Sequence, residues 1–371
     1  MINYHEIGQQ VINLHNQLRI EWPQLRRIAL ALYDKQTDEL YTFVNATIGQ
    51  KILPHYTKRL ADVPSLEQLA KTGETRIIDD LNIFASNATP HSEAILQSGF
   101  RSSFTVPMIA ADNTLQGFIF YDADESSFFT PSMQEHLELY SELIHSLVIA
   151  DLLPVTMLQA AVKISQTVTH YRDEETGEHI ARMSHYARLI ALSMADKWKL
   201  SDAFLNYILL YAPLHDIGKI AIPDTVLLKP GPLDESEMVI MKTHVMKGTE
   251  IIDKLIHEFG LGDAFHTSIL KNIVAYHHEK IDGSGYPYGL RGDAIPYESR
   301  IAAVADVFDA LTSDRSYRQA WTIEEAFHYL SSNKGTLFDA DCVDALISRR
   351  SEVLTIKNLF CKKSYCPKES N

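Results

Sequence analysis

Residues 214–219 place an imidazole, a carboxylate and an ammonium group side by side at the end of an apolar segment. The stretch reads Leu214-His215-Asp216-Ile217-Gly218-Lys219, and residues 205–214 have the apolar character of a buried helix. A histidine followed by an aspartate is unremarkable alone, but further ligand-type residues follow at wide spacing, above all His277 and His278. We therefore interpret the C-terminal half of the chain as helices assembled around a metal site at His215 and Asp216.

Further ligand-type residues are spread over separate helical segments of the same half. They are Glu175, His179, His244, His277, His278 and Asp306. A single inward histidine is more often a hydrogen-bonded core residue than a ligand, and Glu175 could be a solvated part of an acidic run. Together, imidazoles and carboxylates from five helical segments are typical of two closely spaced first-row metal ions such as iron or manganese. Asp216, beside His215, is then the natural bridging ligand.

Two kinds of periodicity divide the chain. Up to about residue 130, strand-like runs joined by polar turns predict an α+β domain around an antiparallel sheet. Its hairpin strands are expected at 28–33 with 40–44 and at 102–108 with 117–121, and its helices at 1–25, 65–71 and 92–97. From residue 178 onward, helical spacing predicts an all-α domain with helices at 180–194, 202–214, 235–256, 264–277, 298–312, 323–332 and 341–349. We expect the two domains to span residues 1–150 and 151–371.

A long helical connector is predicted between these domains. Thr130 and Pro131 form a good helix start, and apolar residues then recur at alternating steps of three and four, as in a short coiled-coil seam. The seam residues are Leu137, Tyr140, Ile144 and Leu147. We expect the seam to stop before Pro154, a second helix to run over 155–170, and the pair to form a homodimer contact. An ordinary amphipathic helix packed on its own domain is the alternative.

The amino-acid composition narrows the classes of molecule that the protein is expected to bind. The net charge of −14 argues against a nucleic-acid polymer or a basic membrane anchor, but a single phosphorylated small molecule needs only a few local cations. The N-terminus lacks the pattern of a signal peptide, and charged residues and a proline interrupt the apolar segment 139–158, so we expect no membrane span. Three cysteines in 371 residues favour a reducing, cytoplasmic location.

The C-terminal motifs resemble a known family. His215-Asp216 with distant Asp306 resembles the HD superfamily of metal-dependent phosphohydrolases. His277-His278-Glu279, followed by the glycine-rich loop 281–289, resembles the HD-GYP family of cyclic dinucleotide phosphodiesterases. The resemblance extends over residues 155–350 and includes the stretches 175–179, 213–220, 227–231 and 305–315 in the same order.

The resemblance implies a role for each matching residue. One metal ion would be held by His179, His215, Asp216 and Asp306, and the second by Asp216, His244, His277 and His278. Glu175 matches a glutamate that supports a third ion in some members. The positions that contact phosphate correspond to Lys219, Arg315 and Arg318. The loop residues Gly285, Tyr286 and Pro287 would shape the substrate pocket.

The implied reaction is hydrolysis of a 3′–5′ phosphodiester in cyclic di-GMP or 3′,3′-cyclic GMP-AMP by a hydroxide that bridges the two ions. Asp216, His215 and Lys219 would carry the catalysis, with Lys219 neutralising charge on the phosphoryl group. The products would be a linear dinucleotide and then mononucleotides. An HD-type nucleotide phosphatase, a receptor that binds the dinucleotide without cleaving it, and a redox role for a di-iron site are the alternatives.

The N-terminal half resembles a different family. Residues 98–108, 115–120 and 129–131 resemble the later part of a GAF domain, and the likeness extends over about residues 10–150. It implies a domain that senses a small ligand. No cysteine lies in this half, which argues against a thiol-attached chromophore, and a domain that only dimerises or packs is the alternative.

Overall fold

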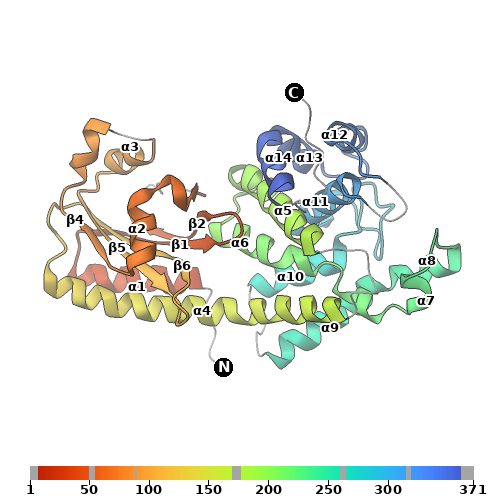
Figure 1. Ribbon diagram of the computed structural model, residues 1–371, viewed down its shortest axis with the longest axis horizontal. Coiled ribbons are helices and arrows are strands. Elements are labelled where there is room, and N and C mark those ends of the chain that lie inside the picture. The colour runs from red at the N-terminus through yellow and green to blue at the C-terminus, as the bar shows by residue number, and fades with distance from the viewer. Residues whose placement is uncertain are drawn as a thin grey trace. The chain divides into compact units, whose positions relative to one another are not determined.

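The chain folds into two compact units, residues 1–153 and 154–371. The computed structural model describes residues 7–49, 55–87, 90–168, 177–259, 265–314 and 319–360. The first unit is an antiparallel sheet with helices and the second is helical (Figure 1). The predicted fold class is therefore confirmed.

The first unit is built on a six-stranded antiparallel sheet in the order β3-β2-β1-β6-β5-β4. The strands are β1 Leu25–Asp34, β2 Glu39–Thr47, β3 Thr57–Arg59, β4 Arg76–Ile78, β5 Ser102–Ile109 and β6 Leu115–Ala123. The predicted hairpins are β1–β2 and β5–β6, and β1 pairs with β6 to join the two hairpins at the centre of the sheet. The short edge strands β3 and β4 escaped prediction because three residues carry too little alternation to be recognised.

Helices cover the two faces of this sheet. Helices α1 (Ile7–Glu21) and α4 (Pro131–Val168) lie on one face, where the Tyr121 hydroxyl contacts the Ser141 hydroxyl of α4 at 2.8 Å. On the other face, Leu66 and Leu69 of α2 (Pro64–Thr72) pack in a cluster with Phe118 of β6. Short helices η1 (Leu60–Asp62), η2 (Leu81–Asn87) and α3 (Pro90–Gln97) connect the strands.

The connector is a single helix rather than the predicted pair. Helix α4 continues through Pro154, although a proline lacks the N–H that would bond to the Ala150 carbonyl. One missing hydrogen bond is tolerated here because strong helix formers, such as Leu152 before it and Met157 after it, lie on both sides.

The predicted seam on α4 faces its own domain. Leu137 and Ile144 are fully buried, and the Leu137 carbonyl accepts from the Tyr121 hydroxyl at 3.4 Å. The same period of three and four residues describes a helix packed on a sheet, so the spacing alone could not identify the partner. The segment 131–157 of α4 has the length and hydropathy of a membrane span, and 22% of its most apolar window is buried within the protein.

Among the described residues of the second unit, the regular elements are helices, joined by loops, with one isolated β-bridge between Lys334 and Phe338. Its longer helices are α5 Gly177–Trp198, α6 Asp202–Tyr211, α8 Glu235–Lys242, α9 His244–Glu258, α10 Phe265–Tyr276, α11 Tyr297–Thr312, α12 Ile323–Ser332, α13 Ala340–Ser348 and α14 Arg350–Leu359. The short helices are η3 Ala212–Leu214, η4 Ile217–Ala221, α7 Asp224–Leu227 and η5 Gly292–Ala294. The helix expected over 235–256 is divided at Thr243, whose backbone N–H and hydroxyl both donate to the Ile240 carbonyl. His244 consequently begins α9 instead of lying inside a longer helix.

Burial of His15 predicts a pH dependence for the first unit. Its Nε2 lies 3.0 Å from the Leu25 carbonyl oxygen, which joins α1 to β1, and burial with the nearby charge of Arg19 lowers the pKa of the imidazole. Below a pH of about 6.5 the unfolded chain therefore binds a proton that the folded chain does not, so stability falls as pH falls.

We expect the urea midpoint of the transition that exposes Trp22 to fall more between pH 7.5 and 5.5 in wild type than in His15→Gln. Fluorescence isolates this transition in chains that carry W198F and W321F, because Trp22 is then the only tryptophan. Equal falls in the two proteins would show that His15 does not set this dependence.

Candidate metal centre

Helix ends bring the predicted ligands together. His179 lies in the first turn of α5, His215 and Asp216 lie between η3 and η4, and His244 begins α9. His277 and His278 follow the last residue of α10, and Asp306 projects from α11. Their side chains form two groups, Asp216 with His244, His277 and His278, and His179 with His215 and Asp306. Within each group the possible ligand atoms lie within 4.8 Å of one another.

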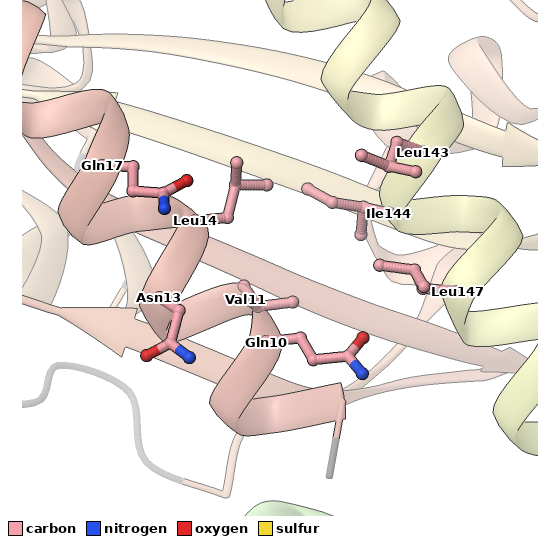
Figure 2. Close-up of a pocket in the computed structure, with 8 residues that line it drawn as sticks. All are labelled: Gln10, Val11, Asn13, Leu14, Gln17, Leu143, Ile144 and Leu147. Carbon is pink, nitrogen blue, oxygen red and sulfur yellow. The ribbon is translucent and has the colours of Figure 1, made fainter. Parts of the chain in front are cut away.

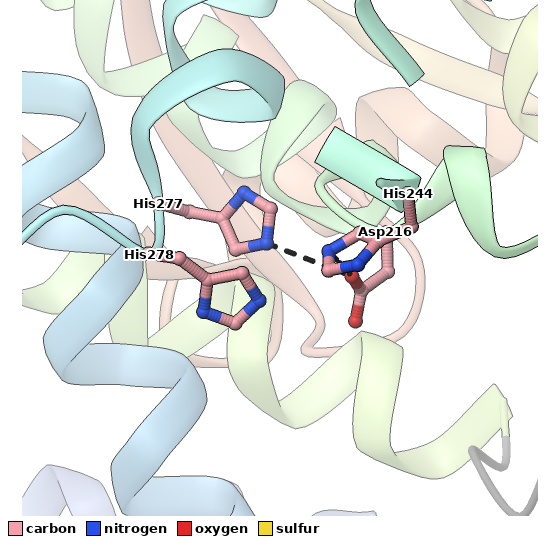
Figure 3. A group of neighbouring side chains, drawn as sticks. All are labelled: Asp216, His244, His277 and His278. Carbon is pink, nitrogen blue, oxygen red and sulfur yellow. Dashed lines mark ion pairs between the residues drawn. The ribbon is translucent and has the colours of Figure 1, made fainter. Parts of the chain in front are cut away.

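The Asp216 carboxylate connects the two groups. Its Oδ1 lies 3.0 Å from Nε2 of His244 and 3.6 Å from Nε2 of His277, while its Oδ2 lies 3.2 Å from Nε2 of His215. Figure 3 shows the three imidazoles of the first group gathered around this carboxylate. Each oxygen thus faces a different group, which is the arrangement required of a bridging ligand.

Three buried polar atoms of the metal site lie close together without hydrogen bonds between them. Nε2 of His244, Nε2 of His277 and Oδ1 of Asp216 are buried and have no hydrogen-bond partner among the described residues, although they lie close together. On each of the two rings the other nitrogen, Nδ1, lies within hydrogen-bonding distance of a backbone carbonyl oxygen, Met241 at 2.8 Å and Ile273 at 3.0 Å. Nδ1 carries the proton in that arrangement, so Nε2 presents a lone pair. Buried lone pairs converging on one point fit a metal ion.

The protonation states also suit metal binding. Burial lowers the pKa of His277 and lowers that of His278 well below its ordinary value, so both imidazoles are neutral at neutral pH. Burial by itself would raise the pKa of Asp216, but the charge of Lys219 and the contacts with the His215 and His244 imidazoles outweigh it and hold the pKa well below the ordinary value. Neutral imidazole and ionised carboxylate are the forms that bind metals. Two groups of this composition suggest a binuclear metal site.

Lys219 lies beside the same carboxylate. Its Nζ is 2.9 Å from Oδ2 of Asp216, and about a fifth of its side chain is exposed. The lysine therefore presents a positive charge beside the carboxylate while remaining open to solvent on one side.

The glycine-rich loop packs directly against His278. The Tyr286 ring stacks on the His278 imidazole with the ring centres 4.6 Å apart, and Nζ of Lys242 lies 5.0 Å from the Tyr286 ring centre. Gly285 permits this approach, because a Cβ there would lie 2.4 Å from the Lys280 nitrogen and 2.6 Å from the His278 carbonyl oxygen. The Tyr286–Pro287 peptide bond is cis.

A buried carboxylate holds the far end of the loop. Glu279 accepts hydrogen bonds from the backbone N–H groups of Tyr288, at 2.7 Å, and Leu290, at 2.9 Å. The loop that carries Tyr286 is therefore anchored to the residue that follows His278.

Three predicted site residues, Glu175, Arg315 and Arg318, lie outside the described residues. The sequence interpretation also overlooked Asp309, which contacts His179 behind the metal site, and Arg182, which contacts Asp309. The spacing of residues in the sequence does contain a signal for both. His179 and Arg182 are three residues apart on α5, as are Asp306 and Asp309 on α11, so each pair shares a helix face.

Residues 171–342 match the family model of the HD domain, and this segment of the chain is an HD domain. The segment contains every predicted metal ligand.

The chain is 48% identical over 197 residues to the cyclic di-GMP phosphodiesterase response regulator RpfG of Xanthomonas campestris pv. campestris, a match that covers 53% of this chain and 49% of the relative. It is 41% identical over 186 residues to the 3′3′-cGAMP-specific phosphodiesterase 2 of Vibrio cholerae serotype O1, covering 50% of this chain and 34% of the relative. The chain thus spans at most about half the length of these curated relatives.

Similar solved structures include the phycocyanobilin-bound GAF domain of a cyanobacterial phytochrome. The identity is 14% and the TM-score 0.32, and the match covers 40% of this chain and 87% of that one. The likeness is too distant to carry a ligand or a function.

Close backbone contact at Gly218 predicts that this residue controls the position of His244. A Cβ on Gly218 would lie 1.8 Å from the His244 carbonyl oxygen and 2.5 Å from the Gly248 nitrogen, so Gly218→Ala must push α9 away from η4. We expect the variant to lose roughly 100-fold in metal-dependent activity, the scale of a 1 Å misplacement, and to bind fewer metal ions per chain by elemental analysis.

Gly8→Ala is the matched control. A Cβ at Gly8, in helix α1, meets nothing within 4 Å, so we expect unchanged metal content. Full metal occupancy in Gly218→Ala would show that the contact between η4 and α9 does not position His244.

Proposed function

We propose that this protein is a metal-dependent phosphodiesterase that hydrolyses a cyclic dinucleotide, either cyclic di-GMP or 3′,3′-cyclic GMP-AMP. The observation that carries the proposal is the Asp216 carboxylate shared by two groups of metal ligands, in an HD domain that also contains the Tyr286 loop. The similar relatives are named for one or the other of these substrates, so both belong in the proposal.

Two divalent ions, iron or manganese by their preference for imidazole and carboxylate, would supply Lewis acidity and activate water for attack on phosphorus. His179, His215, Asp216 and Asp306 would hold one ion, and Asp216, His244, His277 and His278 the other.

The chain's own residues would orient and neutralise the substrate. Lys219, beside Asp216, would offset the negative charge that develops on the phosphoryl oxygens. Burial raises the pKa of Tyr286 far above neutrality, so its hydroxyl stays protonated and can donate a hydrogen bond. The Tyr286 ring, held between His278 and Lys242, offers an apolar surface at the edge of the metal site.

Asp216→Ala tests the proposal. Loss of the shared carboxylate should abolish metal retention and reduce hydrolysis of both dinucleotides to background, measured by elemental analysis and by chromatography of linear products. Asp253→Ala is the control, because Asp253 is an exposed carboxylate of α9 paired with Lys271. Retained turnover in Asp216→Ala would refute the metal assignment.

The same assay separates the competing functions when wild-type protein is loaded anaerobically with iron or manganese. Phosphate release from nucleotide monophosphates or triphosphates, without dinucleotide cleavage, would favour a phosphatase. Tight binding with no product over hours would favour a receptor. Oxygen consumption would favour a redox role.

We also propose that the protein is a homodimer through α4, by a surface beside the predicted seam. Exposed residues on this helix recur at steps of four and three, the spacing of a coiled coil. They are Leu139, Leu143, Ser146, Ala150, Leu153 and Met157, which we call the exposed stripe. Leu143 also lines a groove between α1 and α4, beside Leu14 and Val11 (Figure 2). A second copy of α4 carries the same repeat and is the partner that such a stripe fits.

Leu143→Glu combined with Leu153→Glu should convert a dimer to a monomer, because each copy would place like charges in the contact. Analytical ultracentrifugation at tens of micromolar measures the change. Ile20→Glu, at an exposed apolar position of α1, is the matched control and should stay dimeric. A monomeric wild type would contradict the proposal, and binding of that monomer to lipid vesicles would assign the stripe to a membrane instead.

A further inference from the structure

His179 is held differently from three of the other metal-site histidines. Nδ1 of His215, His244 and His277 lies close to a backbone carbonyl oxygen, at distances of 2.9, 2.8 and 3.0 Å. Nδ1 of His179 lies 2.6 Å from a carboxylate oxygen, Oδ2 of Asp309. A charged acceptor binds the imidazole N–H more strongly than a carbonyl does.

Asp309 is itself fixed on its other side. It is fully buried, and Arg182 donates to both of its oxygens, from Nε to Oδ1 at 2.6 Å and from Nη2 to Oδ2 at 2.9 Å. The Ser313 hydroxyl donates to Oδ2 at 3.2 Å. The bidentate arginine keeps the carboxylate ionised and prevents its rotation, so the oxygen that faces His179 has one position.

The support of a histidine by Asp309 and Arg182 belongs to one metal position only. Helix α5 contributes His179 and Arg182, and α11 contributes Asp306 and Asp309, so the same two helices supply ligands toward the metal and their support behind it. The group of His244, His277 and His278 has no contact with Asp309 among those that the structure describes. The group of His179 and His215 also contains its own carboxylate, Asp306, whereas the group of His244, His277 and His278 has only the shared Asp216.

We infer that Asp309 is a positioning residue that makes the two metal positions unequal, with the ion at His179, His215 and Asp306 bound more tightly. Its carboxylate fixes the His179 tautomer, so that Nε2 faces the metal, and raises the basicity of that nitrogen. The inference rests on the two-ion site of the proposed function but does not depend on hydrolysis.

Asp309→Asn tests it by metal affinity rather than by activity. Asparagine keeps the size of the side chain but removes the charge that His179 faces. We expect chelator competition with Mn²⁺ to show two unequal affinities in the wild-type full-length chain. In the variant, the tighter affinity should weaken by about 10- to 100-fold, the usual effect of removing such a partner, and the weaker one should stay unchanged. The Mn²⁺ electron paramagnetic resonance spectrum of the first-filled position should change as well.

Two controls separate this role from a structural one. Ser313→Ala removes a neighbouring contact while leaving the carboxylate and should not change either affinity. The double variant Arg182→Gln/Asp309→Asn removes both charges and avoids an unpaired buried arginine. It should weaken the same metal position, and it replaces the single variant if that one folds poorly.

The melting temperature of metal-free protein reports on the fold alone. A lowered metal-free melting temperature with both affinities unchanged would overturn the inference, as would equal weakening of the two positions. Failure of every variant and the wild type to bind Mn²⁺ would instead contradict the proposed metal site itself.

Discussion

The buried charge of Asp216 organises the second unit. An ionised carboxylate cannot be removed from water without compensation, and here compensation comes from Lys219 on one side and imidazoles on both. The helix ends converge on this carboxylate because His215, His244 and His277 all contact it with Nε2. The position of each helix is therefore linked to one side chain, and the chemistry of the site depends on that side chain as well.

Close backbone approach makes this convergence possible. Gly218 allows η4 to touch the first residue of α9, and Gly285 allows the loop to fold back onto the residues that follow α10. In both places a side chain would occupy space already filled by backbone, which a protein interior cannot rearrange cheaply. The glycines thus belong to the site although they have no ligand atom, and they position His244 and Tyr286 respectively.

Much of the fold and of the metal site could be predicted from residue types and spacing. Which side chains contact one another could not. Residue types predicted that the histidines share a two-metal site with Asp216, and the family resemblance implied which histidines belong to which group. The contact of Asp309 with His179 was overlooked. The spacing of a carboxylate on a helix gives the face on which it lies, but not the side chain that it contacts once the helices pack. The edge strand β4 likewise depends on its pairing with β5, a tertiary contact that outweighs local preference.

Helix α4 shows why periodicity alone is ambiguous. Its two apolar faces have the same spacing, and one of them, with Leu137 and Ile144, is buried in its own domain. The other face, with Leu139 and Leu143, remains exposed. A helix with two apolar faces also passes a hydropathy test for a membrane span, because that test averages around the helix instead of comparing its sides. Because one face is buried, the proposed homodimer would use the exposed stripe and not the predicted seam.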